Sequence, residues 1–199
     1  MSITLQTLKE LLIVPHEIIV KKAKAKDRNE AISMLIINWI LIAIGVSLIS
    51  SNYSFGLAML VFGIIGTLIS AFFIYLAFAV IGEKGDYVSA LIALTYPFFG
   101  VSFSTLLISI ISISIWSEVA SIFIGFIGAI LFLLYFTVGL TGMFRVLKEN
   151  FKTDLVSVWI VVSLLILAIT LSIYNLATLY ASKTISSSLF IPNLIARLA

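Results

Sequence analysis

Few side chains in this sequence could carry out acid–base, nucleophilic or metal chemistry. The chain has no cysteine and a single histidine, His16. Disulfides, thiolate catalysis and cysteine-based zinc sites are therefore excluded, and the histidine lacks partner ligands. General acid–base catalysis needs titratable groups set at one depth. The candidates, all placed between apolar stretches, are His16, Glu17, Glu83, Asp86, Glu149 and Asp154. Their positions suit helix caps and solvated loop charges better, so we expect no enzyme, no cofactor and no metal ion.

The elements that must position these groups are strongly apolar. Of the 199 residues, 62% are apolar and 11% are charged, and the mean hydropathy is +1.24. Soluble domains carry about 25% charged residues. A water-soluble fold of this size could not hide so much apolar surface, so the surrounding solvent must be a lipid bilayer.

Five apolar segments are long enough to cross a bilayer as helices. We therefore predict an all-α, polytopic membrane protein, built as a five-helix transmembrane bundle with an N-terminal amphipathic segment. The expected spans are residues 31–50, 55–81, 87–113, 118–143 and 155–180. Residues 1–30 form the predicted amphipathic and basic segment, residues 31–183 the transmembrane domain, and residues 184–199 an amphipathic tail on the outer face.

The distribution of Lys and Arg predicts the orientation of these spans. Cations gather in the N-terminal segment, at Lys84 and in the connection around Lys148, whereas only Lys183 and Arg197 fall on the opposite side. Under the positive-inside rule, the N-terminus then lies in the cytoplasm and the C-terminus outside an integral, multi-pass cell membrane protein. This topology accounts for the net charge of +3 without any nucleic-acid partner.

A basic cluster directly precedes the first span. Its members are Lys21, Lys22, Lys24, Lys26 and Arg28. One interpretation is a topology signal that touches anionic headgroups, where each charge contributes about 1 kcal/mol near the surface. The other interpretation is a docking patch for an acidic partner.

The third span should be kinked and rich in hydroxyl groups. Pro97 lacks an amide hydrogen, and the carbonyl it frees needs a partner in lipid, for which Thr95 or nearby serines are available. The serines after it either line a wet cavity or pack at tight helix contacts. Asn38, in the first span, is expected to hydrogen-bond between helices.

Small residues predict where helices approach one another closely. In the second span, Gly63 and Gly66 predict a close contact with a neighbouring helix. In the fourth span Ser121, Gly125 and Ala129 recur every four residues and predict a packing face.

Three helix starts carry similar strings of the form acid-x-Val/Ile-Ser-x-x-Ile. They begin at Glu30, Asp86 and Asp154. An acid and a serine near a helix N-terminus accept hydrogen bonds from free amide groups and complement the helix dipole. The strings indicate either independent capping or a repeated hairpin. Asp27 with Glu30 is also expected to form a variant capping box.

The chain resembles the Yip family of membrane proteins, named as interactors of Ypt/Rab GTPases. The resemblance rests on Pro15 ahead of the basic cluster, on the stretch from Gly82 through Tyr87 to Pro97, and on residues 142–154. It covers most of the chain and implies five spans with a cytoplasmic N-terminus. The acidic-aromatic-Gly-Pro motif of eukaryotic members is missing, so the resemblance implies a prokaryotic, archaeal-type member, and Rab binding is not carried over.

These observations favour a non-enzymatic membrane scaffold or accessory subunit of a membrane complex. Its expected partners are the lipid bilayer with its anionic headgroups, and other membrane subunits or a second copy. The candidate partner-binding residues are Lys21, Lys22, Lys24, Lys26, Arg28, Glu83, Asp86, Tyr87 and Asp154. The alternative is a passive channel or small-solute carrier that uses the hydroxyl-rich third span.

Overall fold

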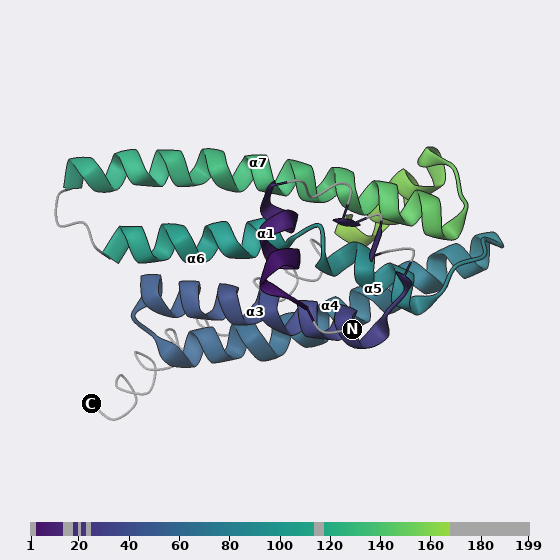
Figure 1. Ribbon diagram of the computed structural model, residues 1–199, viewed down its shortest axis with the longest axis horizontal. Helices are drawn as coiled ribbons and strands as arrows, with labels where there is room; N and C mark the ends of the chain where they lie inside the picture. Colours follow the sequence, from purple (N-terminus) through teal and green to yellow (C-terminus); the bar gives the residue numbers. More distant parts are fainter. Residues whose placement is uncertain (1–2, 14–17, 20, 23–24, 114–117, 168–199) are drawn as a thin grey trace, which may run out of the picture. The chain divides into compact units, whose positions relative to one another are not determined.

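All regular secondary structure in the described part of the chain is α-helical. The computed structural model describes residues 3–13, 18–19, 21–22, 25–113 and 118–167 (Figure 1). The helices are α1 (Leu5–Ile13), α3 (Arg28–Ser50), α4 (Tyr53–Ile81), α5 (Tyr87–Thr95), α6 (Phe99–Ile113), α7 (Glu118–Phe151) and a final helix, Leu155–Leu167. Among these residues four segments are long and apolar enough to cross a membrane, namely Arg28–Ser50, Tyr53–Ile81, Tyr87–Ile113 and Ile122–Phe151. The prediction of an all-α polytopic membrane bundle is confirmed.

The chain divides into two units, Met1–Trp159 and Ile160–Ala199. The helix Leu155–Leu167 occupies the start of the predicted fifth span. The rest of that span and the predicted outer tail lie outside the described residues, so the five-span count and the domain boundaries stay predictions. All contacts given below belong to the first unit.

Helix α7 extends further than its sequence predicted. The expected span ended near residue 143, with Arg145, Lys148 and Glu149 in the following connection, but the helix continues to Phe151. No Gly or Pro interrupts this stretch, and Arg145 Nε pairs with Glu149 Oε1 one turn later at 3.2 Å. The helix ends where Lys152 takes a φ of +55° and the Thr153 N–H bonds the Lys148 carbonyl at 3.2 Å. This is the hydrogen bond of a Schellman cap.

Helix α4 is capped by its own neighbouring residues at both ends. The Asn52 side chain accepts a hydrogen bond from Phe55 N at 3.2 Å at its start. At its end Gly82 takes a φ of +90° and the Glu83 N–H bonds the Phe78 carbonyl at 3.0 Å. A left-handed φ disfavours any residue with a Cβ, which explains the glycine at this position.

The contacts between helices place α5 at the centre of one end of the helix bundle. Helix α3 lies between α4 and α6, and α6 also contacts α7, while α5 contacts α3, α4 and α7 (Figure 1). Five consecutive residues of α5, 89–93, are buried, so its whole circumference is covered. In the span Tyr87–Ile113, 56% of the most apolar window is buried, compared with 11% for α4 and for α7. Helices α4 and α7 therefore expose most of their apolar surface.

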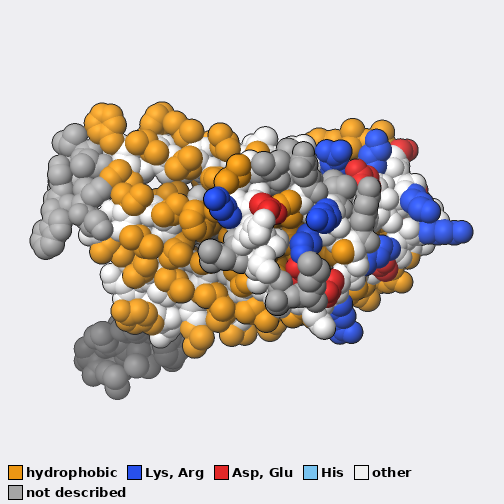
Figure 2. All heavy atoms as spheres, viewed as in Figure 1, with side chains coloured by type: hydrophobic (Ala, Val, Ile, Leu, Met, Phe, Trp, Pro, Cys, Tyr) orange, Lys and Arg blue, Asp and Glu red, His pale blue; other side chains and the backbone are white. Residues whose placement is uncertain are grey.

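The charged side chains gather at one end of the first unit, and hydrophobic side chains cover the other (Figure 2). At the charged end α3 and α5 begin and α4 and α7 end, because Lys26 reaches Asp86 and Phe78 stacks on Phe151 with ring centroids 4.5 Å apart. We call this the polar end. It unites the three cation-bearing segments that the orientation argument placed on one side, whereas Lys183 and Arg197 lie outside the described residues.

Small residues mark close helix contacts at some predicted positions but not at others. A Cβ on Gly63 would collide with the indole ring of Trp39 on α3, as predicted. A Cβ on Gly66 or Gly125 would meet nothing within 4 Å, and Ala129 is exposed. Gly125 and Ala129 line an open groove with Ile49 of α3 and with Thr105 and Ile108 of α6, so no helix of the described chain packs closely against these two positions. The glycines of α7 that contact another segment are Gly128, Gly139 and Gly142.

Helix α1 begins at a threonine cap. Thr4 Oγ1 accepts a hydrogen bond from Thr7 N at 3.3 Å, and the buried Leu11 lies on the helix that contacts α6. The helix thus packs on the bundle as well as carrying the predicted amphipathic pattern.

Candidate functional site

Three aspartates cap the helices that begin at the polar end. Asp27 Oδ1 accepts hydrogen bonds from Asn29 N and Glu30 N at 3.0 and 3.1 Å. Asp86 Oδ1 accepts one from Ser89 N at 2.7 Å, and Asp154 Oδ1 accepts one from Ser157 N at 2.6 Å. Each carboxylate satisfies an N–H group that has no partner within its helix, next to the positive end of the helix dipole.

The repeated helix start holds for two of its three members. Asp86 and Asp154 have the same geometry, in which the acid accepts from the N–H of the serine three residues later. Glu30 does not act as the cap of its helix, because Asp27 does. The first start is therefore shifted by three residues relative to the predicted alignment.

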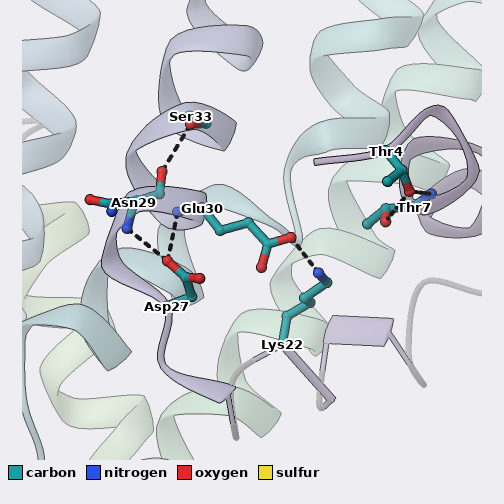
Figure 3. A network of polar contacts seen from close by, with 7 residues as sticks. All are labelled: Thr4, Thr7, Lys22, Asp27, Asn29, Glu30 and Ser33. Atoms are coloured by element: carbon teal, nitrogen blue, oxygen red, sulfur yellow. Dashed lines mark hydrogen bonds and ion pairs between the residues drawn. The ribbon is translucent and has the colours of Figure 1, made fainter. Parts of the chain in front are cut away.

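Glu30 instead holds the N-terminal segment through a buried ion pair. Its carboxylate binds Lys22 Nζ (Figure 3), and the two side chains are 3% and 14% exposed. The second half of the expected capping box, a return of the Glu30 side chain to Asp27, is replaced by this pair. Removing Lys22 alone would leave a buried carboxylate unpaired, which costs about 3–5 kcal/mol.

Asp86 serves two partners with its two carboxylate oxygens. Oδ1 caps α5, and Oδ2 accepts a hydrogen bond from Lys26 Nζ at 2.6 Å across 60 residues of sequence. Both side chains of this pair are nearly half exposed, so solvent and salt screen it. The structure thus places Asp86 next to one member of the basic cluster, Lys26.

The caps also determine the ionisation of the three aspartates. The backbone hydrogen bond from Glu30 lowers the pKa of Asp27, and that from Ser157 lowers the pKa of Asp154. Partial burial raises the pKa of Asp86, but the hydrogen bonds from Lys26 and Ser89 outweigh it and leave the pKa below its usual value. All three groups are therefore held as carboxylates and suit capping rather than proton transfer.

The other predicted binding residues are spread over the polar end. Lys21 and Arg28 are exposed, and Lys24 lies outside the described residues. Glu83 is half-buried. The Tyr87 hydroxyl donates to the Leu68 carbonyl of α4 at 3.2 Å. The structure thus joins Asp86 with Lys26 and fixes Tyr87 to α4, while no recorded contact joins Asp154 to Glu83, Asp86 or Tyr87.

An aromatic junction at the polar end was not singled out in the sequence. Phe151, fully buried at the end of α7, stacks on Phe78 of α4. A Cβ on Gly85 would collide with the Phe151 ring, so this glycine lets the connection between α4 and α5 pass over it. The chain is so rich in apolar residues that its sequence did not distinguish Phe78 or Phe151 from the other phenylalanines.

The kink at Pro97 is built from polar and small groups of two neighbouring helices. The Phe99 N–H, which would bond Thr95 O in a continuous helix, bonds the Tyr96 carbonyl at 3.3 Å. The Thr95 carbonyl accepts from Asn38 Nδ2 of α3 at 2.7 Å. The predicted interhelical role of Asn38 is confirmed. Of the predicted hydroxyl donors, Thr95 bonds the Leu91 and Ile92 carbonyls at 2.9 and 3.4 Å just before the kink.

Helix α7 provides a notch for the kink. A Cβ on Gly139 would lie 2.9 Å from the Pro97 carbonyl oxygen. A Cβ on Gly142 would lie 3.3 Å from both Pro97 Cβ and Ile19 Cδ1. Ile19, which is buried, therefore packs from the N-terminal segment against the same notch.

The hydroxyl groups of α6 bond to their own helix. Ser102, Ser104 and Ser109 are buried, and each donates to a backbone carbonyl three or four residues earlier. Thr105 and Ser112 do the same. Three buried polar atoms elsewhere, Asn38 Oδ1, Ser89 Oγ and Thr153 Oγ1, have no hydrogen-bond partner in the described chain.

No group of three or more His, Cys, Asp or Glu side chains able to hold a metal ion occurs among the described residues. Comparisons with protein-family models, with curated proteins and with solved structures find no match for this chain.

Proposed function

We propose that this chain is a non-enzymatic integral membrane scaffold or accessory subunit. The proposal places the polar end in the cytoplasm, in keeping with the positive-inside rule. Support comes from the charged side chains of the polar end. The aspartates cap helices, and Glu30 and Glu149 sit in ion pairs, so these groups have structural uses.

The observation that carries the proposal is the pair of open glycine positions, Gly66 on α4 and Gly125 on α7. On both helices other glycines, Gly63 and Gly128, touch a side chain of a neighbouring helix. At Gly66 and Gly125 a Cβ would meet no atom of the described residues within 4 Å. Small residues in apolar helices let another backbone approach closely, so these faces suit a further transmembrane helix.

Measuring particle mass in lipid tests this proposal. We expect the chain, extracted with its surrounding lipid, to form particles that contain more protein than the 21.8 kDa of one chain. Gly125→Leu should reduce the protein mass, because the larger side chain blocks close approach at that face. Phe123→Leu, which changes an exposed residue of the same helix, should leave the mass unchanged. Particles with a single chain and no companion would contradict the proposal.

A passive channel or carrier is the second candidate. It is favoured by two of the three buried polar atoms without a partner in the described chain, Asn38 Oδ1 and Ser89 Oγ, because buried polar groups usually have a partner, including water. The internally bonded hydroxyls of α6 lend it no support. Solute flux into vesicles that contain the purified chain tests it, and flux that is the same for the chain and for Asn38→Leu would count against a path through this region.

A further inference from the structure

The cations of the polar end fall into two groups that the sequence does not separate. Lys22, Lys26 and Arg145 are engaged by Glu30, Asp86 and Glu149. A second group is exposed and takes part in no ion pair among the described residues. Its members are Lys21, Arg28, Lys84, Lys148 and Lys152, which we call the cation ring.

Three contacts bring the cation ring together from four segments. The Lys22–Glu30 pair fixes Lys21 beside the start of α3, where Arg28 is the first residue. The Lys26–Asp86 pair ties this region to the connection that carries Lys84. Gly85 packs against the Phe151 ring, which brings the same connection to the end of α7 with Lys148 and Lys152. Figure 2 shows several of the basic side chains at this end.

The carboxylates of the polar end do little to neutralise the ring. The three aspartates accept from backbone N–H groups at helix starts, where each faces a partial positive charge of about half a unit. Glu30 and Glu149 are paired. Glu83 and the exposed Asp154, which is attracted by Lys148 of the ring, are the described carboxylates of this end that balance part of the charge of the five cations. The exposed charge of this surface is therefore positive.

We propose that the cation ring binds the anionic headgroups of the surrounding lipid. The ring lies where apolar helices end, at the level of a headgroup layer, and headgroup phosphates complement its charge. The lipid contact is then made by four segments rather than by the N-terminal basic cluster alone, since two lysines of that cluster already bind carboxylates. The proposal does not depend on the protein companions proposed above.

The unfolding temperature in lipid nanodiscs tests this proposal. In discs of phosphatidylcholine, adding phosphatidylglycerol should raise the unfolding temperature of the natural chain. The ring variant Lys84→Gln/Lys148→Gln should lose roughly two-fifths of this rise, because two of five comparable charges are gone. The matched variant Lys26→Gln/Arg145→Gln also removes two cations, but both are engaged in ion pairs, so the rise should persist.

The lipid-dependent rise is the readout, so a general loss of stability in a variant does not affect the conclusion. Equal losses in the two variants would overturn the proposal, as would the lack of any rise in the natural chain. A rise of the same size from inorganic phosphate in phosphatidylcholine discs would assign the surface to soluble anions instead and would also overturn it. Particle mass is measured separately, so failure of the scaffold proposal remains distinguishable from failure of this one.

Discussion

Asn38 Nδ2 donates a 2.7 Å hydrogen bond to the Thr95 carbonyl, two residues before Pro97. Both residues are buried, with exposures of 5% and 0%. The bond joins α3 to α5 at the point where the third span loses its regular hydrogen bonding. A helix break inside a bilayer needs such a partner because no water is present to bond the carbonyl.

Replacing Asn38 should therefore destabilise the bundle. Asn38→Leu keeps a similar volume and leaves the Thr95 carbonyl buried without its donor, which costs about 1–3 kcal/mol. The free energy of unfolding, measured by denaturing-detergent titration in mixed micelles, gives the cost. Ser112→Ala is the control, since this exposed hydroxyl bonds only to its own helix in the described structure, and it should change stability by less than about 0.5 kcal/mol. Equal stability of the two variants would show that the Asn38 bond contributes nothing.

The contact between α7 and Pro97 leads to a second prediction. Replacing two glycines of α7 by alanine should change the free energy of unfolding in opposite directions. Gly139→Ala places a Cβ 2.9 Å from the Pro97 carbonyl oxygen, and the resulting shift of backbone should cost about 1–3 kcal/mol. Gly125→Ala meets no atom of the described residues within 4 Å and gains helix propensity, up to about 1 kcal/mol. Unfolding of both variants in the same micelles compares them. Stabilisation by Gly139→Ala would mean that the kink does not rest on α7.

Local chemistry explains which parts of this structure the sequence could predict. A cap needs only an acid and an N–H group three residues later, so Asp86 and Asp154 could be assigned from their neighbours. The long apolar runs predicted the helices for a similar reason, since each helix satisfies its own backbone groups. The end of α7 was misplaced because the charges at Arg145 and Glu149 suggested a connection, although they pair along the helix.

The contacts between distant segments could not be predicted in this way. Lys26 and Asp86 stand 60 residues apart, and several lysines of the basic cluster were equally suitable partners. Asn38 was expected to bond between helices, but its acceptor depends on which carbonyl of the kink faces α3. The Phe78–Phe151 stack could not be predicted because phenylalanines are spread throughout the chain and many other pairs were equally plausible.

The ends of α4 and α7 provide a third prediction through their backbone conformations. Gly82 has a φ of +90°, so Gly82→Ala should cost about 1–2 kcal/mol, the usual penalty for a Cβ in the left-handed region. Lys152 has a φ of +55°, so Lys152→Gly should relieve strain and give a small net gain, below about 1 kcal/mol. Unfolding titrations measure both. A loss at Lys152→Gly would mean that the lysine side chain contributes more than its conformation costs.

The three capping aspartates predict how stability depends on pH. Their pKa values in the folded chain lie below the usual value of 3.8. At low pH the unfolded chain therefore binds more protons, so this stabilisation is fully present above the unfolded pKa and is lost as the pH falls through the folded pKa values. We expect the unfolding temperature to be level near neutral pH and to fall below about pH 4.

Asp86→Asn isolates one of these groups, because the amide retains a side-chain oxygen to cap α5 but cannot ionise. The acid-induced fall should be shallower in this variant than in the natural chain. Asn52→Ala is the control: it removes the non-ionising cap of α4 and should lower the unfolding temperature by a similar amount at every pH. If Asp86→Asn also shifted the whole curve in parallel, Asp86 would act as a cap whose charge is irrelevant, and its ion pair with Lys26 would contribute nothing to the fold.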